Sequence, residues 1–193
     1  QDFLAPLLKQ FNLYRPNVRI ELRNLGTEQQ RAALVDQTID VGFMLGPFST
    51  AGIVTSQLRE EQLLVVMPED HPLAKRDTLT AADLRGEKLV IGSENSWSVY
   101  RRAIFSEFDR MGISPRIAQE APTTSAVLAL VGAGMGITIF PRSPSLYLTN
   151  QMALRPFIAT QSKLTTICAW SKANPNPSIP ALLDCVSSTA ARA

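Results

Sequence analysis

Strand-like and helix-like segments alternate along this chain of 193 residues, and this order limits the possible fold more than any other feature. Residues 3–11 carry apolar side chains at helical spacing, and residues 18–24 alternate between apolar and polar side chains as a half-exposed strand does. Thr27 and Gln30 have the spacing of a capping box, which predicts a second helix before a short apolar strand at 39–43. This order predicts a mainly parallel sheet with helices on its faces.

The alternation begins again after Pro68, and no polar linker separates the two halves. We therefore expect an α/β protein of two lobes, whose crossing strands lie at residues 63–67 and 164–170. The remaining expected elements are strands at 88–92, 113–120 and 137–140, and helices at 97–111, 124–131 and 179–186.

Residues 121–141 contain no charged side chain, and this stretch is long enough to span a bilayer. The glycine-rich residues 132–136 interrupt it. A buried helix, a glycine turn and a buried strand explain the stretch better than a membrane span does. We expect no membrane association.

The charge balance excludes strong nucleic-acid binding by this chain alone, because 19 Lys and Arg stand against 17 Asp and Glu. The basic residues Arg101, Arg102, Arg110 and Arg116 are interleaved with acidic residues, which indicates a solvated face. The two cysteines, Cys168 and Cys185, form no disulfide framework, and the first residues lack the basic region of a signal peptide. A cytoplasmic protein with reduced thiols is expected.

The residues needed for common catalytic or metal sites are missing from the sequence. The single histidine, His71, precedes Pro72 and is expected to be an exposed turn residue. No phosphate loop or nucleophile elbow is present, and residues 132–136 stand between a helix and a strand, the reverse of a dinucleotide fingerprint. We expect no enzyme activity, no metal and no cofactor.

Hydroxyl and amide residues stand where three expected helices begin after strands. They are Thr27, then Ser93, Asn95 and Ser96, and then Thr123, Thr124 and Ser125. Such residues are ordinary N-caps, yet helix N-termini also attract anions, so both roles are compatible with one ligand crevice. Trp97 either walls this crevice or packs between the lobes.

Seven segments of the chain resemble the effector-binding domain of LysR-type transcriptional regulators. The matching segments are PNVRIEL at 16–22, GTEQQ at 26–30, IDVGF at 39–43, HPLA at 71–74, LRG at 84–86, LVGAGMGI at 130–137 and FP at 140–141. Within that family the chain looks most like regulators that respond to aromatic acids.

The resemblance implies two Rossmann-like lobes of the periplasmic-binding-protein type II architecture, joined by two crossing strands. Residues 1–66 and 169–193 would form lobe I and residues 67–168 lobe II, with a small organic anion, such as a carboxylate, held between them. By position, the implied effector contacts are Leu4, Thr27, Ser93, Asn95, Ser96, Trp97, Thr123, Thr124, Pro141, Arg142 and Cys168.

Two departures from the family pattern stand out. The first strand of lobe I is absent from this sequence, as are the winged helix-turn-helix DNA-binding domain and its linker helix. In addition, some aromatic-responsive members carry an arginine where Met44 and Leu45 follow Phe43 here.

The resemblance implies a cytoplasmic sensor domain that modulates DNA binding and transcription, with DNA contacted only through the domain missing here. Self-association as a homodimer or tetramer is expected, through the helices at 3–11 and 124–131. The alternatives are a solute-binding protein of a transporter and, less favoured, a two-lobed α/β enzyme.

Overall fold

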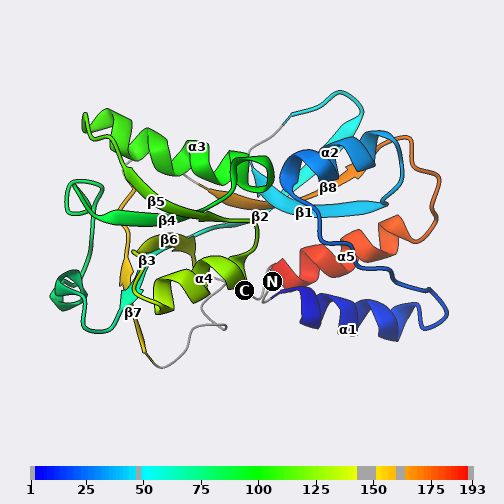
Figure 1. Ribbon diagram of the computed structural model, residues 1–193. Helices are drawn as coiled ribbons and strands as arrows, with labels where there is room; N and C mark the ends of the chain where they lie inside the picture. The colour runs from blue at the N-terminus through cyan, green and yellow to red at the C-terminus, as the bar shows by residue number, and fades with distance from the viewer. Residues whose placement is uncertain (1–2, 47–48, 143–150, 160–163, 191–193) are drawn as a thin grey trace. The chain divides into compact units, whose positions relative to one another are not determined.

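The chain folds into two compact units in a computed structural model, which describes residues 3–46, 49–142, 151–159 and 164–190 (Figure 1). Unit 1 comprises Gln1–Glu60 and Thr165–Ala193, and unit 2 comprises Glu61–Leu164. The chain therefore passes from one unit to the other twice, next to residue 60 and next to residue 165. The α/β fold of two units is confirmed. The two strands expected to cross between the units do not do so, because the strand at 63–68 lies within unit 2 and the strand at 165–171 lies within unit 1.

Unit 1 is a small sheet between two layers of helices. Its elements are α1 (Leu4–Tyr14), α2 (Thr27–Val35), β1 (Val41–Gly46), β2 (Ile53–Glu60), β8 (Thr165–Ser171) and α5 (Ile179–Ala190). Strand β8 lies between β1 and β2 and is antiparallel to both. Alternate residues of β8 then serve opposite faces: Cys168 packs in the cluster with α1 and α5, whereas Ile167 and Ala169 pack with Leu34 of α2.

Unit 2 holds the larger set of strands. Its elements are β3 (Leu63–Pro68), the 3-10 helix η1 (Pro72–Lys75), β4 (Lys88–Gly92), α3 (Glu94–Arg110), β5 (Arg116–Ala121), α4 (Thr124–Gly132), β6 (Thr138–Pro141) and β7 (Met152–Pro156). Strand β3 runs antiparallel to β6 and β7, and β4 runs parallel to β5. A parallel bridge between Leu89 and Ile137 joins β4 to the start of β6.

The prediction of a mainly parallel sheet is wrong for most strand pairs. Strands β3 and β8 each occupy the middle of a three-stranded sheet and run against both neighbours. Only β4 and β5 form an extended parallel pair among the described residues. Apolar periodicity predicts that a strand exists, but it carries no information about the direction of the strand's neighbours.

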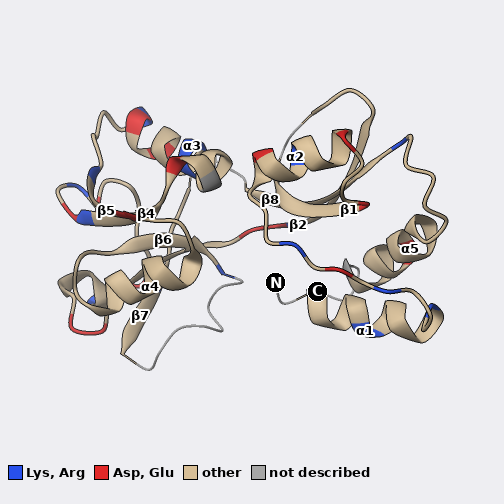
Figure 2. Cartoon of the chain, turned by 45° about the vertical axis from the view of Figure 1, so that its right-hand side comes forward, with Lys and Arg blue, Asp and Glu red and all other residues tan. Residues whose placement is uncertain are grey.

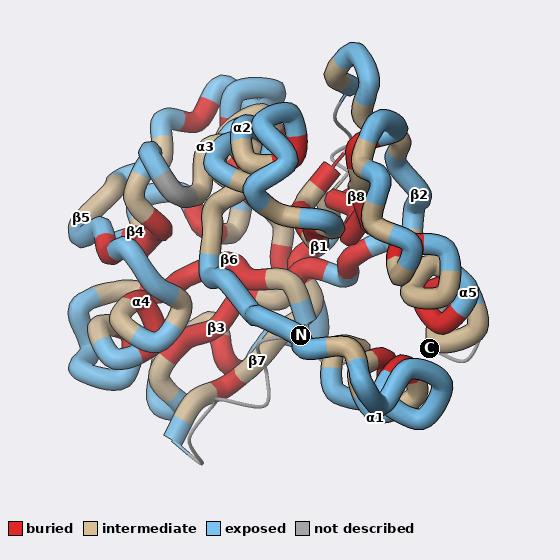
Figure 3. The backbone as a smooth tube through the Cα atoms, turned by 90° about the vertical axis from the view of Figure 1, so that its right-hand side faces the viewer, coloured by how far each residue is buried: buried red, intermediate tan, exposed pale blue. Residues whose placement is uncertain are grey.

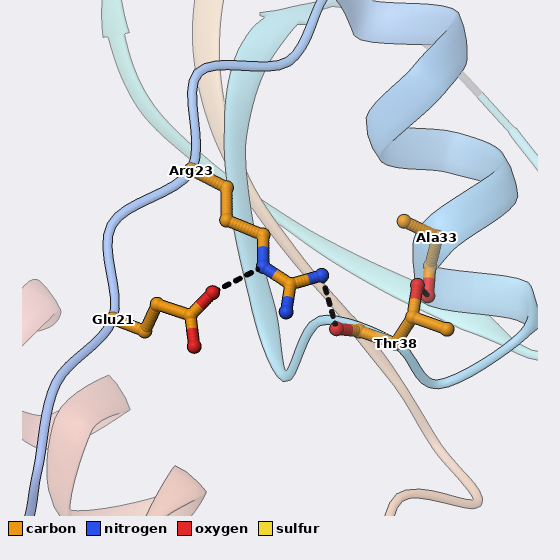
Figure 4. Close-up of polar contacts among 4 residues, drawn as sticks. All are labelled: Glu21, Arg23, Ala33 and Thr38. Carbon is orange, nitrogen blue, oxygen red and sulfur yellow. Dashed lines mark hydrogen bonds and ion pairs between the residues drawn. The ribbon is translucent and has the colours of Figure 1, made fainter.

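The predicted strand at 18–24 is also wrong. No described strand pairs with this segment, and Ile20 and Leu22 keep 41% and 64% of their surface exposed. Arg23 instead donates to the Glu21 carboxylate (2.7 Å) and to the Thr38 carbonyl oxygen (3.3 Å), as Figure 4 shows. An alternating segment becomes a strand only where a neighbour satisfies its backbone groups.

The uncharged stretch at 121–141 forms a buried helix, a turn and a buried strand, as expected. Helix α4 carries no charged residue (Figure 2) and buries Val127, Leu128 and Val131, and buried positions continue through β6 (Figure 3). Gly134 has a positive φ of 73°, which ends the helix. None of the helices in the described part of the chain is long and apolar enough to cross a membrane.

Candidate functional site

The carboxyl ends of β4, β5 and β6 meet at one edge of unit 2. The Ser93 N–H donates to the Ala121 carbonyl oxygen (2.9 Å), which joins the end of β4 to the end of β5. The Val90 N–H donates to the Ile137 carbonyl oxygen (2.8 Å), so β6 runs beside β4 in the same direction. We call residues 92–97, 121–125 and 140–142 the strand-end surface. In α/β sheets this edge is where ligands bind.

Helix α3 begins on the strand-end surface with an uncapped hydroxyl. Ser93 is the N-cap residue, but its side chain makes no capping hydrogen bond to the helix. Asn95 is exposed in the first turn, and the side chain of Ser96 lies outside the described part of the structure. The backbone departs from helical geometry at Trp97 (φ −128°, ψ 22°), which separates this first turn from the rest of α3.

Trp97 packs within unit 2 and forms the apolar part of the strand-end surface. Its ring centroid lies 5.3 Å from that of Phe140 and 5.5 Å from that of Tyr100. Its Nε1 donates to the Pro122 carbonyl oxygen (3.1 Å). The indole lies directly over Gly92, where a Cβ atom would collide with the ring. All of these contacts are made within unit 2.

Helix α4 begins with a hydroxyl that does cap. The Thr123 Oγ1 accepts a hydrogen bond from the Ala126 N–H (3.3 Å) and lies 3.1 Å from the Ser125 Oγ. Thr123 is exposed and Thr124 is half-buried. Capping uses one acceptor of the Thr123 hydroxyl and leaves the first N–H groups of the helix without intrahelical partners.

The end of β6 supplies a cation to the strand-end surface. Pro141 pairs with Leu63 across β3 and β6, and Arg142 follows it. The Arg142 N–H donates to the Gln62 carbonyl oxygen (2.8 Å), and its Nη1 donates to the Gln62 Oε1 (2.9 Å). Arg142 is exposed and forms no ion pair within the described residues.

The remaining candidates, Leu4, Thr27 and Cys168, lie in unit 1. Leu4 is half-buried against the cluster that contains Leu7 and Phe11, and Thr27 is the first, half-buried residue of α2. Cys168 has no exposed surface, and this burial raises the pKa of its thiol to about 12. The neighbours of Cys168 are the apolar residues of the cluster that contains Leu7 and Phe11.

The predicted capping box of Thr27 and Gln30 is wrong by one residue. Gly26 is the N-cap, and its N–H donates to the Gln29 Oε1 (2.9 Å). The Gln30 Nε2 instead donates to the Leu25 carbonyl oxygen (2.9 Å) and the Phe43 carbonyl oxygen (3.1 Å), and so connects α2 to β1. The Thr27 hydroxyl takes no part in this capping contact, because the Gln29 side chain provides the acceptor for the Gly26 N–H.

His71 caps the short helix η1 and is more enclosed than the sequence predicts. Its Nδ1 accepts from the Leu73 N–H (3.3 Å), its Nε2 lies 3.5 Å from the Glu87 carboxylate, and only 18% of its side-chain surface is exposed. Within the described ranges no group of three or more His, Cys, Asp and Glu is placed to hold a metal ion.

The strand-end surface combines hydrogen-bond donors, an aromatic wall and one cation, an arrangement suited to a small organic anion. Sequence reasoning missed three of its supporting residues, namely Gln62, Gly92 and Tyr100. The Gln62–Arg142 pair is separated by 80 residues. Only the pairing of β3 with β6 brings these two side chains together.

Comparisons with known proteins show what this chain is similar to. A family model described as the LysR substrate binding domain matches residues 1–191. AlsR, a transcriptional regulator of Bacillus subtilis, is 27% identical over 92% of this chain and 59% of its own length. HcaR, the Hca operon transcriptional activator of Escherichia coli, is 31% identical over 92% of this chain and 60% of its own.

The fold matches a solved effector-binding domain. The BenM domain with its effector benzoate superposes with a TM-score of 0.84 at 26% identity, covering 98% of this chain and 86% of that domain. The curated relative BenM comes from Acinetobacter baylyi. This chain spans only 59–60% of the length of AlsR and HcaR. These matches favour a regulator domain over the two alternatives, a solute-binding protein and an enzyme.

Proposed function

Because the chain belongs to the LysR substrate-binding-domain family, we propose that it senses a small organic anion for a bacterial transcriptional regulator. The observation that carries this proposal is the strand-end surface of unit 2, where two helices begin beside an aromatic ring and a cation. Donors at helix N-termini favour a carboxylate, and the ring of Trp97 favours an apolar ligand body.

The ligand class that we propose is a small carboxylate with an apolar body. BenM, whose effector-binding domain shares this fold, has benzoate as its effector, which makes benzoate a suitable first probe. The proposed contacts in unit 2 are Ser93, Asn95, Ser96, Trp97, Thr123, Thr124, Pro141 and Arg142. In unit 1 the proposed contacts are Leu4 and Thr27, and Cys168 is not among them because it has no exposed surface.

For the whole protein we propose a cytoplasmic homodimer or tetramer that binds DNA through a domain outside this sequence. The support is that AlsR and HcaR are named as transcriptional regulators and are longer than this chain. Ligand binding would change transcription only if the anion has different affinities for two states of the regulator.

The proposal is tested by calorimetry and thermal shift with a panel of small carboxylates that includes benzoate, with benzamide as its neutral analogue. We expect benzoate to raise the melting temperature and benzamide to do so less, because a bound ligand stabilises the folded state. If no carboxylate of the panel binds, the proposed function is wrong.

Thr27→Val is the first variant to combine with this assay. Losing a hydrogen bond to a charged ligand group should weaken benzoate binding about tenfold to a hundredfold. Stability should change little, because the Gln29 side chain caps α2. Thr78→Val, at an exposed position of unit 2, is the matched control. Equal affinity in the wild type and Thr27→Val would remove Thr27 from the site.

A further inference from the structure

Gln62 and Arg142 form a two-point contact at the edge of the strand-end surface. Because Leu63 pairs with Pro141, the residue just before β3 and the residue just after β6 lie opposite each other. The backbone contact (2.8 Å) fixes the position of Arg142, and the side-chain contact (2.9 Å) fixes the direction of its guanidinium. The long, exposed side chain of Arg142 is thus already held in one orientation. It therefore loses little further conformational entropy when it binds a ligand.

The partner of Arg142 is an amide, which orients a guanidinium without neutralising it. Other arginines of unit 2 are held by carboxylates: Arg101 by Glu120 (2.9 Å) and Arg76 by Asp83 (3.1 Å). Arg142 keeps its full positive charge, since none of the described carboxylates lies within ion-pair distance of it. A guanidinium carries five N–H donors, and Gln62 occupies one of them.

We propose that Gln62 is a positioning residue that aims Arg142 at the carboxylate of the ligand. This inference rests on the proposed function and deepens it. Arg142 would bind the carboxylate with its remaining N–H groups, in the paired geometry that guanidinium and carboxylate favour. Phe140, two residues before Arg142, is buried and packs edge-to-face against Trp97. The apolar body of the ligand would then contact the indole of Trp97.

Gln62→Glu separates this role from a purely structural one. The substitution keeps the size and the hydrogen bond to Arg142 but cancels its charge. A structural clamp would be as strong or stronger with glutamate, because a hydrogen bond between two charged groups exceeds one to a neutral amide. We expect the variant to keep its melting temperature and to bind benzoate about tenfold to a hundredfold more weakly than the wild type.

The ratio of the benzoate affinity to the benzamide affinity reports directly on the positive charge of Arg142. In the wild type this ratio should exceed one. In Gln62→Glu and Arg142→Gln it should fall toward one, because only benzoate, and not the neutral benzamide, is attracted by the positive charge of Arg142. Matched controls are Gln119→Glu and Arg102→Gln, which make the same charge changes at exposed positions of unit 2. Their ratios should equal that of the wild type.

The two proposals fail in different ways. A wild type that binds none of the carboxylates overturns the proposed function and, with it, the role of Gln62. A wild type that binds benzoate while Gln62→Glu and Arg142→Gln bind it equally well overturns the inference and leaves the proposed function standing. A drop in affinity that is matched by the two control variants also overturns the inference, because it would reflect net charge alone.

Discussion

At the scale of single residues, the Trp97 ring packs directly against Gly92. The indole occupies the position that a Cβ on residue 92 would need, so Gly92→Ala forces the ring to move. We expect Gly92→Ala to lower the free energy of unfolding by about 1–3 kcal/mol, the usual cost of overpacking. Chemical denaturation followed by circular dichroism measures this loss.

A double-mutant cycle identifies the cause of that loss. With Trp97→Ala in the same chain, Gly92→Ala should cost much less, because the colliding ring is gone. Gly132→Ala is the control, since its nearest neighbour is the flexible end of Met152 at 3.0 Å. Strict additivity of the Gly92 and Trp97 substitutions would contradict this account of the packing.

Residue types alone predict the helix starts of the site but not the contacts between distant residues. Hydroxyl residues at 93 and 123 do stand at N-caps, because the preference for them is local. The contact between Gln62 and Arg142 depends on the pairing of β3 with β6. No pattern in the sequence near either residue reports that pairing.

At the scale of elements, a strand depends on its neighbours more than a helix does. All the predicted helices form, because helical hydrogen bonds lie within one segment. Strand β2 has exposed polar positions and was not predicted, yet it pairs with β8 along most of its length. Residues 18–24 have the better alternation and remain unpaired among the described strands.

The starts of α3 and α4 should respond differently to the loss of their hydroxyls. Thr123→Ala removes a capping bond to the Ala126 N–H, so the free energy of unfolding should fall by about 1 kcal/mol. Ser93→Ala removes no capping bond, so its effect should stay within about 0.5 kcal/mol. Urea denaturation of both variants makes the comparison, and equal losses would show that Ser93 caps α3 in solution.

At the scale of the whole molecule, the apolar residues of α1 divide into two sets. Leu7 and Phe11 are buried in the core of unit 1, whereas Leu13 and Tyr14 keep 75% and 63% of their surface exposed. Helix α4 has no charged residue on any face, although its own unit buries only part of it. Two apolar surfaces on one chain can close a two-fold dimer, in which each contact occurs twice.

We predict that the chain forms such a dimer, with α1 of one copy against α4 of its partner. Leu13→Asp places a charge on the exposed end of α1, so it should shift the mass from dimer to monomer without changing the circular dichroism spectrum. Lys9→Asp, at another exposed position of α1, is the control for charge and should dissociate the dimer less. Light scattering at high micromolar protein measures the mass. A wild type that stays monomeric at this concentration would show that Leu13 and Tyr14 are ordinary exposed residues and that α4 is sufficiently covered by its own unit.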